Sequence, residues 1–558
     1  MQTPPALKKD TLRIIPLGGV GEIGRNCTVF EVNDQILIVD CGVLFPEESQ
    51  PGVDLILPDL GYLTDKLDRI AGLVLTHGHE DHIGGIPYLL KMRPDIPIYG
   101  SKLTIAFIQE KLAEHRLTAK VQLVSEGMKS SIGAFECEYV AVNHSIPDAL
   151  AIIIRSKAGV VLATGDFKMD QLPLDGRLTD LRAFAKVGEE GVDLFMVDST
   201  NADIPGFTPL ERDIGPVIEG VISRTRGKVV VASFASHVHR VQQVIEAALN
   251  NDRKVVFVGR SMVKNMKIAA ELGFLHIPDG AVVELNEAAD MPDHSLVFMS
   301  TGSQGEPMAV LSRIANQDHQ IEIGENDTVL LASSMIPGNE NAVYRVIDGL
   351  TRLGANVVHK GNANVHVSGH SAAGELLYCY NVIKPKNVMP IHGEYRHLMA
   401  NAKLAKKTGV AEGNIIVAED GSVVDLVDGK AAIVGKIPCD MLYVDGQAVG
   451  KITEEDLQDR RTLAAEGFIS IFAVVNKETG ELVEGPAIRA KAYAEEDHVF
   501  DDILPAIQQA LRQAASDGVR DSYQFQQVIR KTVGSWVAKA HRRRPVIIPI
   551  VVYSSRPA

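Results

Sequence analysis

The sequence lacks the features that mark secreted, membrane-spanning and thiolate-zinc proteins. Only five cysteines occur in 558 residues, and no two of them form a C-x-x-C pair. Their scarcity argues against a disulfide framework and suits reduced thiols in the cytoplasm. No apolar run reaches the length of a membrane span, and the first ten residues contain no apolar segment of a secretory signal. We therefore expect a cytoplasmic protein that does not enter a membrane.

The chain also has no internal repeat and no low-complexity segment. Its 46% hydrophobic and 23% charged residues are typical of a globular protein. A length of 558 residues exceeds what one core normally serves, so two or three domains are expected. The net charge of −15 is weak evidence against nucleic-acid binding. Salt screens exposed charges beyond about 8 Å, so the local potential matters more than the total charge.

What the sequence does have is a dense group of metal-ligand residues. The motif T-H-G-H-E-D-H places His77, His79, Asp81 and His82 directly after the apolar run Ile70–Leu75. A strand that ends in four such side chains presents them together on a rigid edge, as a multi-metal site requires. A polar surface loop is the simpler alternative, but so many ligand types within six residues favour a metal site.

Further ligand-type residues stand at the ends of other predicted strands. His144 follows Tyr139–Val142, Asp166 follows Val160–Ala163, His392 follows Val388–Ile391, and Asp40 ends Ile36–Val39. A single histidine at a strand end is more often structural. The joint pattern instead predicts that these loops converge on one metal centre.

The H-x-H-x-D-H motif and the order of these residues resemble the metallo-β-lactamase superfamily. The resemblance implies that one metal ion is held by His77, His79 and His144, that a second is held by Asp81, His82 and His392, and that Asp166 bridges the two. Asp40 would be an outer carboxylate that orients a ligand. Nitrogen and oxygen ligands without thiolate suit Zn²⁺ and also tolerate Mn²⁺.

The remaining sequence predicts an α/β protein with an insertion. Residues 1–207 alternate Val/Ile-rich strands with helices such as Ser101–His115, which fits the αββα sandwich of the superfamily. Residues 208–364 alternate buried strands with helices, which predicts a doubly wound parallel sheet. Because His392 must return to the metals, we interpret this block as an insertion that residues 365–440 follow to complete the first domain. A linker at 441–465 then leads to a small α+β domain at 466–558.

Three more motifs resemble the β-CASP nucleases, a metallo-β-lactamase branch with such an insertion. They are Asp198 in V-D-S-T, His370 in V-S-G-H-S-A-A-G-E and His392 in I-H-G-E-Y-R-H. In that branch, histidine at the third motif goes with RNA processing, whereas the DNA-repair members tend to carry valine. The segments L-G-G-V-G-E-I-G-R-N and T-G-S-Q-G-E-P, together with the C-terminal segment, resemble the bacterial ribonuclease J family over essentially the whole chain.

This resemblance implies a two-metal phosphodiester hydrolase that matures and degrades RNA. It would act as a 5′-to-3′ exonuclease on single-stranded 5′-monophosphate RNA and would also cleave internally. It would form a homodimer or tetramer through the C-terminal domain and work with proteins of RNA-decay complexes. A small-molecule hydrolase on the same core and an inactive scaffold in a decay complex remain as alternatives.

The catalytic roles are assigned to three residues. Asp81 would orient the attacking water or receive its proton, and His370 would stabilise charge or protonate the leaving 3′-oxygen. Asp198 would accept a hydrogen bond from a ligand histidine, with His392 as the preferred partner.

Phosphate groups of the substrate need donors outside the metal shell. Ser368–Ser371 opens a predicted helix, whose N-terminus would offer free N–H groups. Ser233 and Ser303 end strands of the insertion and either hold a phosphate or simply cap helices. The predicted substrate-binding residues are Ser233, Ser303, His366, Val367, Ser368, Gly369, His370 and Ser371.

Two other segments have weaker signals. The glycine run Gly18–Gly24 superficially suggests a dinucleotide fingerprint, but it leads into a strand at Thr28–Val32 rather than a helix. We expect a tight turn that brings backbone close to the site. The acidic loop Phe45–Asp54 holds an additional structural cation together with Asp445, or its carboxylates are solvated, which is the simpler interpretation.

Overall fold

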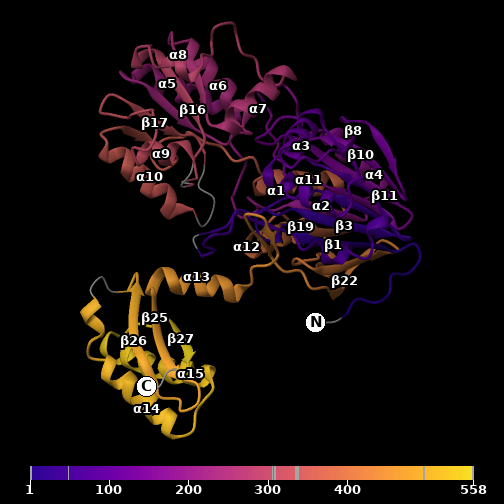
Figure 1. Cartoon of the computed structure of the whole chain (residues 1–558). Coiled ribbons are helices and arrows are strands. Elements are labelled where there is room, and N and C mark those ends of the chain that lie inside the picture. Colours follow the sequence, from indigo (N-terminus) through magenta and orange to yellow (C-terminus); the bar gives the residue numbers. More distant parts are fainter. Residues whose placement is uncertain are drawn as a thin grey trace. The chain divides into compact units, whose positions relative to one another are not determined.

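The structure is a computed structural model that describes residues 3–47, 49–304, 306, 309–333, 339–493 and 497–555. The chain forms two compact units, one of residues 1–45 and 55–442 and one of residues 46–54 and 443–558. Figure 1 shows the elements of each unit.

Two stacked sheets form the centre of the first unit. The first sheet has the strand order β22-β21-β1-β3-β4-β6-β7-β8 and the second has the order β19-β13-β12-β11-β10-β9. The strands of the first sheet are β1 (Leu12–Gly18), β3 (Cys27–Val32), β4 (Gln35–Val39), β6 (Ile70–Val74), β7 (Pro97–Gly100), β8 (Lys120–Leu123), β21 (Ser422–Val427) and β22 (Lys430–Lys436). Those of the second are β9 (Lys129–Ile132), β10 (Phe135–Ala141), β11 (Leu150–Ser156), β12 (Gly159–Ala163), β13 (Leu194–Asp198) and β19 (Asn387–Ile391).

Both faces of each sheet are covered, which produces four layers. In β1, Ile14 packs into the core between the sheets while its neighbour Ile15 packs outward, because successive side chains of a strand point to opposite faces. Helices α2 (Ile86–Met92) and α3 (Lys102–Glu114) cover the outer face of the first sheet. Helices α4 (Leu181–Glu190), α11 (Ala373–Ile383) and α12 (Tyr395–Lys407) cover the second. The predicted αββα sandwich is confirmed.

The segment between β13 and β19 forms a separate, fully parallel sheet of order β15-β16-β14-β17-β18. Its strands are β14 (Val229–Ala232), β15 (Lys254–Val258), β16 (Leu296–Ser300), β17 (Thr328–Leu331) and β18 (Asn356–Val358). Helices α5 (Gly215–Arg224), α6 (Val238–Leu249) and α7 (Arg260–Glu271) pack on one face, and α9 (Val310–Ala315) and α10 (Glu340–Arg352) on the other. The predicted doubly wound insertion is confirmed, while its boundaries at 208 and 364 stay a prediction.

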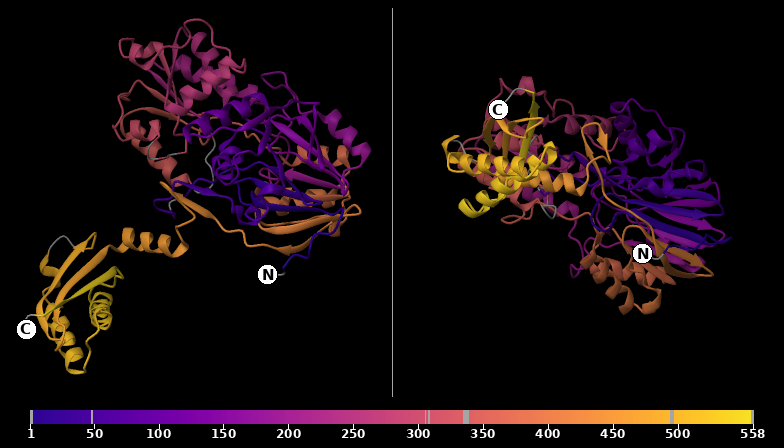
Figure 2. Two further views of the ribbon diagram at one scale, coloured as in Figure 1. Left: turned by 45° about the vertical axis from the view of Figure 1, so that its right-hand side comes forward. Right: turned by 60° about the horizontal axis from the view of Figure 1, so that its bottom comes forward.

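After the insertion, the chain returns to both sheets of the sandwich. Strand β19 pairs in parallel with β13, and β21 pairs antiparallel with β1, about 400 residues away in the sequence. Figure 2 shows the orange strands beside the indigo N-terminal ones. The return through β19 carries His392 back to the edge where the motif of residues 76–82 lies.

The second unit contains a three-stranded sheet of order β26-β25-β27, with two helices on one face. The strands are β25 (Phe468–Asn476), β26 (Leu482–Lys491) and β27 (Val546–Ser554), and the helices are α14 (Leu504–Ser516) and α15 (Ser522–Ala540). This agrees with the predicted α+β domain.

The predicted linker differs from the structure. Residues 441–465 contain β23 (Leu442–Asp445), β24 (Ala448–Val449) and all but the last residue of helix α13 (Glu454–Glu466) rather than an irregular connection. Thr453 starts α13, because its hydroxyl accepts from the Asp456 N–H at 3.2 Å while the Asp456 carboxylate accepts from the Thr453 N–H at 2.8 Å. Residues 46–54 also belong to the second unit, since Asp54 N–H donates to Val444 O at 2.8 Å. Because these two paired segments lie far apart in the sequence, no local sequence pattern could have predicted that they pair.

Within the described part of the chain, no helix combines the length and the apolar character needed to span a membrane.

Candidate metal centre and active site

The motif after β6 is divided between a loop and one helical turn. His77 and His79 lie in the loop, and His79 stands at the start of α1 (Glu80–Ile83), which holds Asp81 and His82. The helical turn reverses the chain, so ligands from both halves of the motif point to the same place. His144 follows β10, Asp166 follows β12 and His392 follows β19.

Three histidines form the first group of ligand atoms. His77 Nε2 lies 3.0 Å from His79 Nδ1, which lies 3.1 Å from His144 Nε2. Asp166 Oδ2 is 3.8 Å from His77 Nε2 and 3.7 Å from His144 Nε2. Four ligands around a tetrahedral zinc ion lie about 3.3 Å from one another. The group therefore has the spacing of a metal subsite.

Asp166 also belongs to the second group, which contains Asp81, His82 and His392. Asp166 Oδ2 is 3.2 Å from His82 Nε2, and Asp81 Oδ2 is 3.5 Å from the same nitrogen and 3.4 Å from His392 Nε2. The structure thus brings all seven predicted ligands together, with one carboxylate placed between two subsites.

Outer contacts fix the orientation of these ligands. Asp40 Oδ2 accepts from His82 Nδ1 at 2.8 Å and from the Thr76 hydroxyl at 2.7 Å, so Nε2 of His82 faces the centre. The carbonyl of Gly369 accepts from His144 Nδ1 at 2.8 Å and leaves its Nε2 toward the metal group. Asp40 lies outside the ligand clusters, as the sequence predicted.

Sequence reasoning missed three of these supporting residues. Thr76 contacts Asp40, Thr200 lies 2.8 Å from His392 Nδ1, and Asn26 Nδ2 lies 3.1 Å from His82 Nε2. Thr76 and Thr200 stand inside the motifs T-H-G-H and V-D-S-T, and Asn26 ends the glycine-rich motif. The sequence signal that could have revealed these three residues is that each is polar and stands inside one of the motifs.

Two site residues have strained backbones. Asp40 and His392 adopt φ values of +59° and +50°. Residues other than glycine pay about 1–3 kcal/mol for such conformations, which persist only where the surroundings enforce them. The N–H of His392 donates to Gly19 O at 2.8 Å, so the backbone of the glycine run lies close to the site, as expected.

Burial and charge divide the histidines into two kinds. Burial holds the pKa of His77 and His144 well below the ordinary value and lowers the pKa of His79 to about 4. Burial also opposes the charge on His392, but Asp166, Asp198 and Asp81 raise its pKa to about 10. The first subsite thus offers neutral ligands, whereas cation binding at the second is coupled to proton release.

The chemistry of the donor set fits a divalent cation. Oδ1 of Asp166 is buried and has no hydrogen-bond partner within the described part of the chain. A buried carboxylate oxygen without a donor is costly unless a cation compensates its charge. The ring nitrogens that converge on it are suitable metal ligands.

His370 lies between the two subsites without belonging to the first. Its ring stacks on His392 with centroids 5.3 Å apart and meets the ring of His144 edge-on at 5.1 Å. His370 Nδ1 is 2.7 Å from Asp198 Oδ2, whereas His392 Nδ1 is 3.7 Å from Asp198 Oδ1 and contacts Thr200 instead. His370 is therefore the nearer partner of Asp198, and the preferred pairing of Asp198 with His392, whose Nδ1 lies 3.7 Å away, stays a prediction.

Asp198 changes the acidity of His370. Burial lowers the pKa of His370, but the neighbouring Asp198 outweighs it and holds that pKa above the ordinary value. Burial conversely disfavours the Asp198 carboxylate, but the charge of His370 keeps the pKa of Asp198 below its usual range. The pair therefore stabilises the protonated form of His370.

Comparison with known families covers almost the entire chain. Residues 20–196 match the metallo-beta-lactamase superfamily, residues 226–350 the beta-CASP domain of ribonuclease J, residues 354–418 the RNA specificity domain of Zn-dependent metallo-hydrolases, and residues 456–554 the C-terminal domain of ribonuclease J. The chain is 51% identical to ribonuclease J of Mycolicibacterium smegmatis over 98% of both chains, and 41% identical to that of Thermus thermophilus over 98% of this chain and 96% of the relative.

The chain belongs to the ribonuclease J family. It is therefore a metal-dependent hydrolytic ribonuclease with an inserted β-CASP domain. A crystal structure of a protein of unknown function from Enterococcus faecalis shares the fold, with a TM-score of 0.53 and 17% identity over 75% of this chain and all of that one.

The sequence predicted an anion-binding site at the N-terminus of the helix that follows Ser371, and this prediction is wrong. Helix α11 begins at Ala373, within two residues of Ser371 as expected, but its first N–H groups already donate to Ile204 O and Gly206 O. Glu375 accepts from the Ala372 N–H at 2.7 Å. The donors of the first turn are thus used inside the protein, because a neighbouring loop and an acidic side chain cap the helix.

The predicted substrate-binding residues just before this helix differ in their burial and hydrogen bonds. Ser371 is buried and its hydroxyl donates to Phe167 O at 3.0 Å, while the partly exposed Ser368 accepts from the His370 N–H at 3.3 Å. His366, Val367 and Gly369 are buried. The segment supports His144 and His370 from behind, and contact of its members with substrate stays a prediction.

Ser233 and Ser303 do not cap helices. The helices that follow them begin at Val238 and Val310, after His237 and Ala309, which make no side-chain cap. Both serines are buried at the carboxyl end of the inserted sheet, and the hydroxyl of Ser233 has no hydrogen-bond partner among the described residues. In the T-G-S-Q-G-E-P motif, Gly305 and Pro307 lie outside the described residues.

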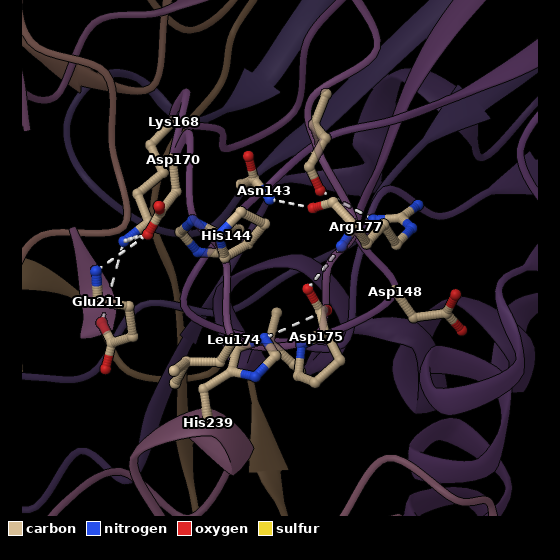
Figure 3. Close-up of a pocket in the computed structure, with 14 residues that line it drawn as sticks. Asn143, His144, Asp148, Lys168, Asp170, Leu174, Asp175, Arg177, Glu211 and His239 are labelled. Atoms are coloured by element: carbon tan, nitrogen blue, oxygen red, sulfur yellow. Dashed lines mark hydrogen bonds and ion pairs between the residues drawn. The ribbon is translucent and has the colours of Figure 1, made fainter. Parts of the chain in front are cut away.

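A polar pocket adjoins His144 on the side of the insertion. Figure 3 shows Lys168 directed toward Asp170 and Glu211, at 3.7 Å and 3.9 Å, and His239 directed toward Asp175 at 3.6 Å. Its carboxylates outnumber its cationic side chains. The pocket therefore suits the polar edges of a bound nucleotide better than another phosphate.

The acidic loop does not gather into a cation site in the described part of the chain. Asp445 pairs with Arg460 at 2.6 Å, and Asp54 accepts from the Gly446 N–H at 2.7 Å. An arginine thus supplies the positive charge that the predicted structural cation would provide. Glu48 of this loop lies outside the described residues.

Gly42 is a position where one methyl group should disturb the centre. A Cβ atom there would lie 1.6 Å from Asp81 O and 2.6 Å from His82 N. Gly42→Ala must displace both ligands, so we predict that it removes about half or more of the bound divalent metal and reduces RNA hydrolysis about 100-fold. Elemental analysis of the purified chain measures the first effect.

Gly413→Ala is the matched control, because a Cβ at Gly413 meets nothing within 4 Å. Normal metal content in Gly42→Ala would show that the backbone of Asp81 and His82 can move without losing the ions.

Proposed function

We propose that the chain is a two-metal 5′-to-3′ exoribonuclease that prefers 5′-monophosphate RNA and also cleaves internally. The observation that carries this proposal is His370, a histidine held by Asp198 next to ligands of both metal subsites. A phosphodiester over two cations would lie within reach of this side chain, which is what acid catalysis of strand cleavage requires.

Two divalent ions, when bound, would activate water and neutralise charge on the phosphoryl oxygens. His77, His79 and His144 would hold one ion, and Asp81, His82 and His392 the other, with Asp166 shared by both. We favour Zn²⁺ for the nitrogen and oxygen set, with Mn²⁺ as a tolerated alternative.

The protein side chains would supply positioning and proton transfer. Asp81 would orient the attacking water at the second subsite, opposite the leaving group. His370, protonated because Asp198 raises its pKa, would donate a proton to the departing 3′-oxygen. The products would carry 5′-phosphates.

The 5′ end would be recognised where the inserted sheet faces the metal centre. Ser233 follows β14, the central strand of the inserted sheet. After β14 the chain adds β15 and β16 on one side of it and then β17 and β18 on the other. Ligands of doubly wound sheets bind at the carboxyl ends of the strands beside such a reversal. The hydroxyl of Ser233, which has no hydrogen-bond partner among the described residues, is therefore our first candidate for a phosphate donor, and Ser303 and His366 are further candidates.

Arg240 links that edge to the catalytic segment. This fully buried side chain donates to Ala332 O after β17 and to Val365 O just before His366, both at 2.8 Å, and it pairs with Glu211. A terminal phosphate held at this edge would place the first phosphodiester over the metals. This geometry favours the RNA substrate over the small-molecule hydrolase and the inactive scaffold.

We place this activity in the cytoplasm, in RNA maturation and decay complexes. All five cysteines are free, as expected in a reducing compartment. We also propose that the chain acts there together with partner proteins of such complexes.

His370→Ala should separate catalysis from metal binding. We predict that metal content stays at the wild-type value while kcat falls on the order of 100-fold or more, because an acid rather than a ligand is lost. The wild-type rate should decline as pH rises through the raised pKa of His370, and this decline should be absent from the variant.

His77→Ala is the contrasting variant, which should lose metal and activity together. If His370→Ala also loses an ion, then His370 is a ligand of the cluster that includes Asp166, Asp198 and His392, and the acid role fails.

The 5′ preference is tested with RNAs of one sequence that differ only at the first phosphate. We expect stepwise release of mononucleotides from 5′-monophosphate RNA, faster than from triphosphate RNA, because extra charge and bulk leave the pocket without matching donors. Ser233→Ala should reduce this ratio by about 10-fold, the effect of one lost charged hydrogen bond.

Ser223→Ala serves as the control, since its hydroxyl is exposed and bonds within α5. Equal rates on both 5′ ends, or mononucleotides released first from the 3′ end, would contradict the proposed direction.

We further propose that the second unit joins copies of the chain into a homodimer or tetramer. In the edge strand β27, Ile548, Ile550 and Val552 are 42%, 45% and 44% exposed on the sheet face opposite α14 and α15, beside Phe472 of β25. An apolar edge strand of this kind is normally covered. A second copy offers the same face, as a symmetric interface needs.

Ile550→Asp should therefore shift the full-length chain toward monomer in light scattering, because a charge would be buried at that interface. Tyr523→Asp is the control, since Tyr523 is 64% exposed on α15. An unchanged mass for Ile550→Asp would place the interface elsewhere.

A further inference from the structure

Positive charge is concentrated at the end of an acidic chain. Residues 522–558 contain seven Lys and Arg and no Asp or Glu, although the whole chain carries a net charge of −15. The cationic residues in the described part of this segment are Arg530, Lys531, Lys539, Arg542, Arg543 and Arg544. Most of them lie on or directly after α15.

The helix has a buried stripe and an exposed surface. Phe525, Ile529, Val533 and Val537 recur every four residues and are buried against the sheet. At 3.6 residues per turn, Lys531 lies opposite this stripe, and Arg530 and Lys539 lie on its two flanks, about 80° and 100° from its centre; all three are exposed. The helix therefore turns an apolar stripe inward and distributes its cations along the exposed surface.

The cations of this surface are not used in ion pairs. Arg543, after the helix, pairs with Glu466 at 3.1 Å and lies over the ring of Tyr493, so it has a structural role. Within the described part of the chain, Arg530, Lys531, Lys539 and Arg542 contact no carboxylate closely enough for an ion pair. Their charge is available to an external anion.

The same surface also has groups suited to nucleobases. Tyr523, in the first turn, is 64% exposed, and Gln527 lies one turn before Lys531. From Tyr523 to Lys539 the helix rises about 24 Å. A strip of phosphate-binding cations with an exposed aromatic ring is the combination that holds single-stranded nucleic acid without sequence preference.

We propose that the exposed surface of α15, defined by Tyr523, Gln527, Arg530, Lys531 and Lys539 and continued by Arg542, binds single-stranded RNA through side chains that are separate from the metal ligands. This inference rests on the RNA substrate of the proposed function. An anionic membrane fits less well, because this surface lacks the large aliphatic residues that insert into lipid. The apolar sheet face assigned to self-association lies on the other side of the unit.

Such a surface would retain long transcripts between successive cleavages. Its loss should weaken the binding of long RNA while leaving the chemical step intact. The side chains concerned make no contact with the metal ligands in the described structure, so kcat should stay at the wild-type value.

The test compares two triple variants of the full-length, metal-loaded enzyme. R530Q/K531Q/K539Q removes three charges from α15, and K451Q/K477Q/K491Q removes three exposed charges from elsewhere in the same unit. KM and kcat are measured on a 40-nucleotide and on a four-nucleotide 5′-monophosphate RNA at several salt concentrations. Thermal unfolding and light scattering establish that fold and mass are retained.

We expect KM for the 40-mer to rise about 10-fold at 50 mM salt in the α15 variant only, with no change for the four-nucleotide RNA. The slope of log KM against log salt concentration should fall by about two, since each phosphate contact on a single strand contributes about 0.7. Addition of Tyr523→Ala should raise KM for the 40-mer further.

Several outcomes would overturn the inference. Equal effects of both triple variants would attribute the change to net charge, and unchanged KM in the α15 variant would show that α15 does not bind RNA. A change in mass would instead make this surface a contact between copies. Failure of the wild-type enzyme to cleave either RNA would refute the proposed function itself, which is a separate result.

Discussion

The compensation of buried negative charge by cations at one sheet edge is the constraint on which the rest of the structure depends. Asp166 is almost fully buried, and one of its oxygens lacks a hydrogen bond in the described structure. Such a group is tolerable only beside positive charge. The fold meets this condition by ending several strands of two sheets at the same place, so that nitrogen ligands surround the carboxylate. Asp40 and Gly369 O then fix the rings of His82 and His144 from behind.

The inserted domain adds specificity because its connections pass through this centre. The chain leaves the sandwich after Asp198 and re-enters it through α11 and β19; His370 lies just before α11, and His392 directly follows β19. Arg240 joins the carboxyl edge of the inserted sheet to the segment that holds His370. A shift of the insertion would therefore move groups at the metals. This connection would couple the proposed recognition of an RNA end to cleavage at the metals.

The C-terminal unit carries an apolar surface and a cationic surface in different places, because its sheet and its helix α15 are both amphipathic. Its sheet must bury one face, which α14 and α15 cover. The opposite face retains Ile548 and Ile550, whose apolar area favours association with a like surface, whereas the exposed surface of α15 carries cations that form no ion pair with any described residue. Hydrophobic contact and attraction of a polyanion thus act on opposite sides, so self-association need not exclude RNA.

The sequence by itself determined the local features. Strong alternation and strand-end ligands predicted β6, β12 and β19 together with His77, Asp166 and His392, because a motif of ligand residues is a local property and the fold family limits how it is assembled. Pairings between distant segments were decided only by the tertiary structure. Asp198 lies 2.7 Å from His370 and 3.7 Å from His392, a difference that depends on side-chain packing. The N-terminus of α11 is closed because a loop of another segment supplies its acceptors, and no local pattern can report which partner arrives there.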